Sequence, residues 1–380
     1  PMKGVPDYIA AAQEAREEAG LFGCVRKKPI GSYQAWKRLP TGFELVKVRV
    51  FRFDVDDQFD TWLEKGQRTL RWVDFDAAAD LIQRNIRSEF CGYETLQEEA
   101  EILAALADGK MLEELKEGMA GELVLSRTPF YAESGGQVGD IGTLRSSSGE
   151  FEVSDTQKLA EGLVIHIGKL VEGTLRVGEK VVAMVDENRR GRIMRHHSAT
   201  HLLNRALHEL VSPTIKQAGS LVAPEYFRFD FAYFEAVGPA KLEAVERRVN
   251  EMIMENLTVK TYPMPFKDVP QSGIIAVFDE KYGDVVRVVD MGGISRELCG
   301  GTHVRQTGQI GLFRVVSESS VAAGVRRIEA VCGFPAYEKT RREHDLVRGL
   351  AQRFSVSPDE LEARIEALQE QNRKLEKELK

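Results

Sequence analysis

Short runs in which apolar and polar residues alternate fill the middle of the chain. ELVLS, GEFEVSDTQ, GLVIHIGKL and GEKVVAMVD follow one another between residues 122 and 186, separated by glycines and serine clusters. Strands at such close spacing favour an antiparallel barrel or sandwich. We therefore predict a small antiparallel β-barrel over residues 119–188.

Helical spacing of apolar residues flanks this region. It predicts a helix from Arg189 to Leu210, followed by mixed strands and helices to residue 333. The acidic segment GYETLQEEAEILAAL predicts a helical linker over residues 88–118. Closer to the N-terminus, residues 7–21 and 73–86 are expected to be helical, and residues 43–55 should form a strand. The whole pattern is typical of an α+β protein.

The last segment, residues 334–380, should be helical. SPDE at 357–360 has the form of a capping box with proline at the first helical position. Apolar residues then recur at spacings of four and three, interrupted by one asparagine, which is the pattern of a coiled-coil seam. We expect a weak homodimer through this helix, or else packing of the helix on its own domain. The seam positions are Leu361, Ile365, Leu368, Asn372, Leu375 and Leu379.

Composition and charge limit the possible partners. A chain of 380 residues and 42.6 kDa should form two or three domains. Its net charge of -7 gives no general basic footprint, so RNA binding would need a local patch. Arg189, Arg190, Arg192 and Arg195 could form one, or could simply line a solvated helix entrance. No apolar run reaches the roughly 18 residues of a membrane span, and four irregularly spaced cysteines indicate a reducing compartment, so we expect a cytoplasmic protein.

Four potential metal ligands occur as two pairs with the same spacing. His197 and His201 lie four residues apart in the predicted helix, which puts both on one face. Cys299 and His303 are also four residues apart. One thiolate and three imidazoles form a tetrahedral zinc donor set and argue against magnesium or calcium. We therefore predict one zinc per chain. Ser198 stands where a metalloprotease would carry its glutamate base, so that activity is not expected.

The segments around these ligands resemble one family. HSATHLLNRALHEL, KQAGSLV, RFDF, ELCGGTHVRQTG and, upstream, RTPFYAESGGQVGD are similar to the editing half of alanyl-tRNA synthetase, over about residues 88–380. Threonyl-tRNA synthetase shares the two ligand pairs, but TPFYAESGGQ and CGGTH fit the alanyl type and its free-standing editing relatives. The class II motifs of the aminoacylation half are not recognisable, so we do not expect this chain alone to charge tRNA.

The resemblance implies a fold and an activity. The fold would be a small barrel, a zinc-binding α+β editing domain over residues 189–333, and the start of a helical C-terminal domain. The activity would be hydrolysis of the ester that joins serine or glycine to the 3′ end of alanine tRNA. Such a site is needed because a pocket for alanine cannot strongly reject either amino acid. Zinc would either activate water or position the terminal ribose and carbonyl, and the sequence leaves both open.

The resemblance also implies roles for single residues. Thr128 matches a threonine that faces the amino acid, where its hydroxyl could bond to a serine side chain. Gln217 matches a glutamine of the editing pocket, and Arg228 would face the substrate or pair with Asp230. Cys299, Gln217 and Thr128 are therefore the candidate catalytic residues. Gly135 and Gly136 would let backbone approach the substrate closely.

Residues 1–87 resemble a different family. QEAREEAGL follows part of the Nudix box, and places Glu14, Glu17 and Glu18 where that family binds magnesium. Gln13 replaces the box arginine, and the preceding strands and glycine are missing. We therefore expect a truncated Nudix-like α/β segment in which magnesium binding is not favoured.

Three functions follow from these patterns. The first is a zinc-dependent aminoacyl-tRNA deacylase. The second is a Nudix-type hydrolase of nucleoside diphosphate derivatives, and the third is a non-catalytic module for tRNA binding or dimerisation. Metal content and deacylation of serine-charged alanine tRNA distinguish them.

Overall fold

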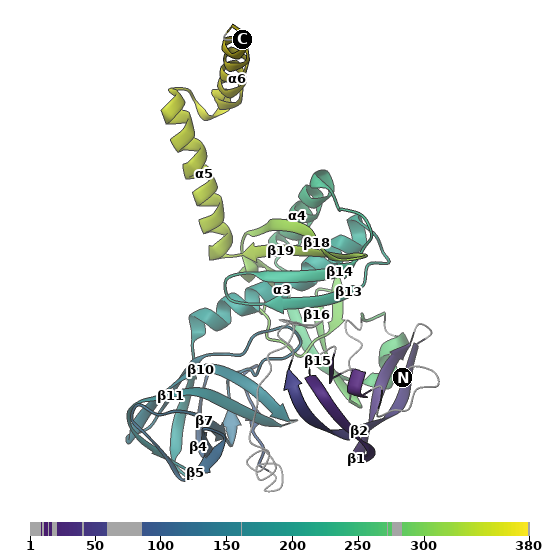
Figure 1. The fold of residues 1–380 in the computed structure, drawn as a ribbon, viewed down its shortest axis with the longest axis vertical. Coiled ribbons are helices and arrows are strands. Elements are labelled where there is room, and N and C mark those ends of the chain that lie inside the picture. The colour runs from purple at the N-terminus through teal and green to yellow at the C-terminus, as the bar shows by residue number, and fades with distance from the viewer. Residues whose placement is uncertain are drawn as a thin grey trace.

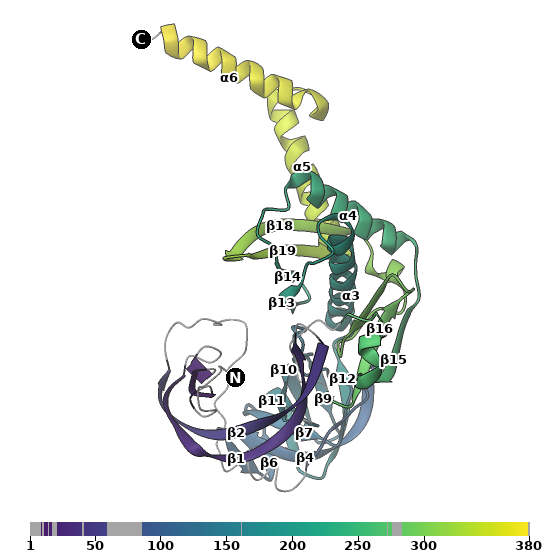
Figure 2. The ribbon, with the colours of Figure 1, turned by 90° about the vertical axis from the view of Figure 1, so that its right-hand side faces the viewer.

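A β-barrel and an α/β unit make up the centre of the molecule, and two helices extend from the α/β unit (Figures 1 and 2). The computed structural model describes residues 9, 11–13, 15–16, 21–39, 42–58, 86–160, 162–271, 273–275 and 283–378. At the N-terminal end, β1 (Leu21–Leu39) and β2 (Gly42–Gln58) form a long antiparallel hairpin, which confirms the strand predicted at 43–55. The helix predicted at 73–86 lies almost wholly outside the described residues.

The predicted barrel is confirmed as a closed antiparallel ring of six strands. Its closure comes from the pairing of β10 with β11, the two long strands of the ring. Leu123, Phe151 and Leu170 are fully buried and belong to its core. In ring order the strands are β10 (Gly149–Ala160), β9 (Gly142–Arg145), β12 (Lys180–Val185), β4 (Gln97–Ala107), β7 (Ala120–Leu125) and β11 (Leu163–Arg176).

The helical linker predicted at 88–118 is wrong. This segment forms β4, β5 (Lys110–Leu112) and β6 (Glu114–Lys116), and β4 pairs with both β12 and β7. Its Ala, Leu and Glu residues are good helix formers. In the fold, however, Ala100 and Ile102 point into the barrel core while Glu99 and Glu101 are exposed, so the alternation of a strand prevails. The barrel therefore begins about twenty residues before the predicted boundary at 119.

A short parallel ladder brings the segment before the barrel against one of its loops. β3 (Glu89–Phe90) pairs with β8 (Arg127–Thr128), with Phe90 opposite Thr128. The chain after β3 is thereby held beside Pro129. The ladder thereby fixes the start of the segment that leads to Tyr93.

The α/β unit places one long helix against an antiparallel sheet. The sheet has the order β13 (Gln217–Val222), β14 (Phe227–Ala232), β19 (Val325–Cys332), β18 (Phe313–Ala322). α3 (Glu187–Leu210) confirms the predicted helix and begins at Asp186, whose side chain accepts from the Arg189 N–H at 2.9 Å. α3 packs with α4 (Pro239–Met254) over a core that includes Leu202, Phe229 and Val249.

A smaller sheet carries the second pair of candidate ligands. It consists of β15 (Val259–Pro265), β16 (Val285–Met291) and β17 (Ser295–Leu298), with the 3-10 helix η1 (Phe266–Gln271) following β15. The loop after β17 leads to a second 3-10 helix, η2 (Thr307–Ile310). Cys299 and His303 lie in this loop.

The C-terminal helices project from the α/β unit (Figure 2). They are α5 (Phe334–Phe354) and α6 (Leu361–Glu378), joined through the 3-10 turn η3 (Pro358–Glu360). The predicted capping box is confirmed, because Glu360 accepts from both the N–H and the hydroxyl of Ser357. In the predicted seam, Leu361 is buried, whereas Ile365 and Leu375 are 36% and 53% exposed. Whether a second copy covers this seam stays a prediction. None of the helices in the described part of the chain has the length and apolar character to cross a membrane.

Candidate metal centre

The four predicted ligands meet at one point. His197 and His201 come from α3, and Cys299 and His303 from the loop after β17. One ligand atom from each lies within 4.8 Å of all the others. Cys299 Sγ is 3.4 Å from His197 Nε2 and 3.3 Å from His303 Nε2. These side chains form a group that could hold a metal ion.

Each histidine is oriented by a partner on its outer nitrogen. Nδ1 of His201 lies 2.8 Å from the Glu297 carboxylate, and Nδ1 of His303 lies 3.2 Å from Ser198 Oγ. Glu297 is fixed in turn by the side-chain amide of Asn204 at 3.0 Å. Such partners turn the other ring nitrogen towards the centre of the cluster. Nε2 of His201 is buried there with no hydrogen-bond partner among the described residues, as expected for an atom meant for a metal.

The hydrogen bond from His197 to Gln137 fixes the tautomer of the His197 ring. Its Oε1 lies 2.7 Å from His197 Nδ1 and accepts the backbone N–H of Thr302 at 2.9 Å. Because a backbone N–H can only donate, the shared atom must be the amide oxygen. His197 Nδ1 must therefore be protonated, which leaves the lone pair on Nε2 to ligate a metal. The amide nitrogen of Gln137 donates to Thr302 Oγ1 at 3.0 Å.

Buried charges make the cluster a place for a cation. Burial by itself would lower the pKa of His201, but the Glu297 carboxylate and Cys299 raise it to about 10. Burial would likewise raise the pKa of Cys299, yet His197 and His303 bring it well below its ordinary value. Burial lowers the pKa of His303 to about 3. A thiolate and a neutral imidazole are the forms that bind metals, and a metal ion would replace the proton on His201.

The loop that carries Cys299 is held by its backbone. Arg287 donates to the carbonyls of Cys299 at 3.0 Å and Gly301 at 2.8 Å, and the Tyr93 hydroxyl donates to the Gly300 carbonyl at 2.5 Å. At Gly301 a Cβ would lie 2.0 Å from Cε1 of His197, so only glycine fits. The backbone of the ligand loop is therefore held by Arg287 and Tyr93 from outside the cluster.

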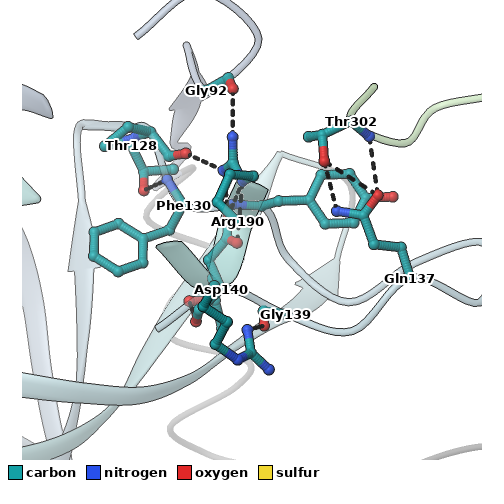
Figure 3. A network of polar contacts seen from close by, with 12 residues as sticks. Gly92, Thr128, Phe130, Gln137, Gly139, Asp140, Arg190 and Thr302 are labelled. Carbon is teal, nitrogen blue, oxygen red and sulfur yellow. Dashed lines mark hydrogen bonds and ion pairs between the residues drawn. The ribbon is translucent and has the colours of Figure 1, made fainter. Parts of the chain in front are cut away.

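Arg190 joins the barrel loop to the start of α3 (Figure 3). Its guanidinium is 1% exposed, forms an ion pair with the equally buried Asp140, and donates to the carbonyls of Gly92 at 2.7 Å and Pro129 at 2.8 Å. The suggested RNA-binding role of Arg190 is therefore wrong, because a buried cation is committed to its partners. Of the other basic residues in the suggested patch, Arg192 is exposed, and Arg195 donates to the Gln309 carbonyl.

Thr128 is fully buried in the barrel. Its hydroxyl lies 2.7 Å from Nε2 of His166 and accepts the Phe130 N–H at 3.1 Å. Nδ1 of His166 is 3.0 Å from the Leu123 carbonyl, which can only accept, so Nε2 must accept from Thr128. The Thr128 hydroxyl is thus committed to the protein in this structure. Its direct bond to a serine substrate stays a prediction.

The other predicted substrate residues lie on β13, β14 and the loop beside them. Gln217 begins β13 and is half-buried. A Cβ on Gly136 would meet Ser220 of β13 at 2.5 Å, whereas Gly135 faces open space. Nε of Arg228 is buried with no hydrogen-bond partner among the described residues. The alternative that Arg228 pairs with Asp230 is wrong.

Asp230 has another partner. Arg327 on the neighbouring strand β19 holds its carboxylate through two hydrogen bonds of 2.7 Å each. Glu14, Glu17 and Glu18, the suggested magnesium ligands, lie outside the described residues.

Three residues that orient the histidines were not predicted as functional. They are Gln137, Ser198 and Glu297. Ser198 and Glu297 each lie within two positions of a ligand, and Gln137 ends the segment ESGGQ that carries the family resemblance. These positions in the sequence could have indicated a functional role. Gln137, however, is 60 positions from His197, so only the fold brings these two side chains together.

Two family models match the chain. One, described as "tRNA synthetases class II (A)", matches residues 42–189, and the other, "Threonyl and Alanyl tRNA synthetase second additional domain", matches residues 286–329. The second match contains Cys299 and His303. The first begins within the segment predicted as Nudix-like and includes Gln137. These matches give no support to the Nudix resemblance of residues 1–87.

Several curated relatives are named alanine–tRNA ligase. The one from Thermotoga maritima is 44% identical over 343 residues, which is 88% of this chain and 40% of the relative. The one from Rhizobium johnstonii is 45% identical over 328 residues, 84% of this chain and 37% of the relative. The one from Methylococcus capsulatus is 48% identical over 298 residues, which is 78% of this chain and 34% of the relative. The chain therefore spans less than half the length of these relatives.

Replacing Gln137 should weaken metal binding. In Gln137→Ala, His197 loses the acceptor that fixes its tautomer, and outer-shell losses of this kind cost about 10- to 100-fold in metal affinity. Competition with a chromophoric chelator measures this directly. Gln157→Ala is the matched control, since Gln157 lies in the same barrel but bonds to Glu133 and Asp155. Equal affinities of the two variants would contradict the role assigned to Gln137.

His166 should make the protein less stable in mild acid. Burial lowers its pKa from 6.5 to about 4, so the unfolded chain binds a proton in this range that the folded chain does not. The stability from neutral His166 is complete above pH 6.5 and is lost as pH falls towards 4, by about 3 kcal/mol in total.

The pH profile of thermal unfolding provides the test. His166→Gln should show a weaker fall in melting temperature between pH 7 and 4.5 than the unchanged protein under identical metal conditions. His344→Gln alters an exposed histidine of α5 and is the control. If His166→Gln and His344→Gln give parallel profiles, His166 is not the titrating group.

Proposed function

Because the chain belongs to the alanyl-tRNA synthetase family, we propose that it carries a zinc-dependent editing activity, the hydrolysis of the ester that joins serine or glycine to the 3′ end of alanine tRNA. The observation that supports this most is the cluster of three imidazoles and one thiolate, whose ligand atoms lie within 4.8 Å of one another. His201 Nε2 is buried there without a hydrogen-bond partner in the described part of the chain. The cytoplasm, where charged tRNA is used, is the proposed location.

Zinc is the proposed metal because the donor set suits it. Three nitrogens and one sulfur complete a tetrahedral shell, and a thiolate disfavours magnesium and calcium. When bound, zinc supplies Lewis acidity that can polarise a carbonyl or orient a ribose hydroxyl. Four protein donors favour the positioning role over activation of water. Gln137, Glu297 and Ser198 hold the imidazoles in the ligating orientation.

The amino-acid pocket is proposed to lie between the barrel loop and the sheet. Gly135 in the loop faces open space, and Gln217 and Arg228 lie on β13 and β14. Arg228 supports this proposal because its buried Nε is a donor without a partner among the described residues. A buried donor of this kind is costly unless a ligand accepts from it, and the carbonyl or hydroxyl of an aminoacyl group can do so.

Metal content and deacylation test the proposal together. The protein should contain about one zinc per chain and should release serine from serine-charged alanine tRNA faster than the uncatalysed rate. Cys299→Ala should lose both the metal and the activity, because a thiolate donor is removed. Cys91→Ala, which removes a half-buried cysteine outside the cluster, is the control and should keep both.

Two outcomes would refute the proposal. One is a folded Cys299→Ala variant that is still fully loaded with metal. The other is serine release that a chelator does not slow although the zinc has been removed. Circular dichroism of each variant shows whether a loss of activity reflects a loss of fold.

A further inference from the structure

Tyr93 lies at the edge of the metal cluster and is held from two sides. Its hydroxyl donates to the Gly300 carbonyl at 2.5 Å, in the middle of the ligand loop. The preceding residue, Gly92, is fixed through its carbonyl by the buried Arg190 at 2.7 Å. Phe90, three positions earlier, is in the β3–β8 ladder and packs edge-on to the Tyr93 ring with a centroid distance of 4.8 Å.

The ring of Tyr93 is nevertheless open to solvent. Its side chain is 46% exposed, although the hydroxyl is bonded and one face is covered. The covering group is the guanidinium of Arg287, 4.0 Å from the ring centroid. Arg287 is fixed in turn by the carbonyls of Cys299 and Gly301. The exposed area therefore belongs to a residue whose ring is already held by Arg287 and Phe90.

The candidate ligands differ in how deeply they are buried. The three ligand histidines are between 5% and 8% exposed. On the other side of the cluster, Cys299 is only half-buried and Gly300 is exposed. The least buried part of the cluster is therefore Cys299 with the neighbouring Gly300, whose carbonyl accepts from Tyr93.

We propose that the exposed face of Tyr93 stacks on the terminal adenine of the bound tRNA. This inference rests on the proposed function. In that substrate the ester to be hydrolysed is attached to the ribose of the last nucleotide. The base on the same ribose must therefore lie close to the reacting carbonyl. Aromatic side chains bind exposed bases by stacking, and a fixed ring loses little conformational entropy on binding. Arg287, behind the ring, adds positive charge close to the phosphate backbone.

The ring and the hydroxyl of Tyr93 have separable roles. The hydroxyl supports the ligand loop, whereas the ring binds the base. Tyr93→Phe removes only the first role, and Tyr93→Leu removes both. A purely structural tyrosine would make both variants equally poor, whereas a stacking tyrosine leaves Tyr93→Phe close to the unchanged protein in RNA binding.

Fluorescence of an uncharged RNA tests this without any hydrolysis. The probe is an acceptor-stem hairpin of alanine tRNA with 2-aminopurine as its last base, added to the zinc-loaded chain. Stacking should quench the probe. Tyr93→Phe should keep the quenching, and Tyr93→Leu should lose it and raise the dissociation constant by about ten-fold. Phe234→Leu, which removes a 94% exposed aromatic residue in the loop after β14, is the control and should behave like the unchanged protein.

If Tyr93→Leu loses its metal, a second variant, Tyr93→Trp, still tests stacking. In Tyr93→Trp the indole replaces the phenol ring, and its emission should respond to a hairpin that ends in adenosine but not to one that ends in an abasic nucleotide. Equal quenching of 2-aminopurine by Tyr93→Leu and the unchanged protein would overturn the proposal, as would equal responses of Tyr93→Trp to both hairpins. Because these readouts measure binding alone, failure of the deacylation assay is distinguishable from failure of the stacking site.

Discussion

The amide of Gln137 is the point on which the two central units of this molecule depend. It comes from a loop of the barrel, yet its oxygen accepts from His197, one of the candidate metal ligands, and from the backbone of the ligand loop. These contacts fix the tautomer of His197 and the position of Thr302 in one step. The geometry of the candidate metal site and the docking of the barrel therefore depend on the same contacts, and a change in one should alter the other.

The buried Arg190–Asp140 pair provides the mechanical support for this contact. Isolated, such a pair would cost more in desolvation than it returns in Coulomb energy. Here, the guanidinium also donates to Gly92 and Pro129, and the carboxylate accepts the Tyr131 N–H at 2.7 Å. The same pair therefore holds the start of α3, the loop that contains Gln137 and the segment that carries Tyr93. α3 contributes His197 and His201 to the cluster, and the other two elements place Gln137 and Tyr93 beside it.

The charges of the cluster favour a cation. Cys299, with its lowered pKa, and the Glu297 carboxylate bring negative charge into a site whose histidines are almost fully buried. The raised pKa of His201 shows that a positive charge is favoured beside them. A divalent cation would supply that charge and would bind Nε2 of His201, which has no hydrogen-bond partner among the described residues. The donor set and the electrostatics thus point to the same occupant.

The sequence by itself determined the four candidate ligands, the long helix and the presence of a barrel, because these follow from local spacing and from recognisable segments. It did not determine the role of residues 88–118, whose helix-forming composition is overridden once β4 pairs between β7 and β12. Nor did it assign Arg190 to the interior or Gln137 to the metal site. Those roles come from contacts across 50 and 60 positions of the chain, and only the tertiary structure brings such groups within hydrogen-bond distance.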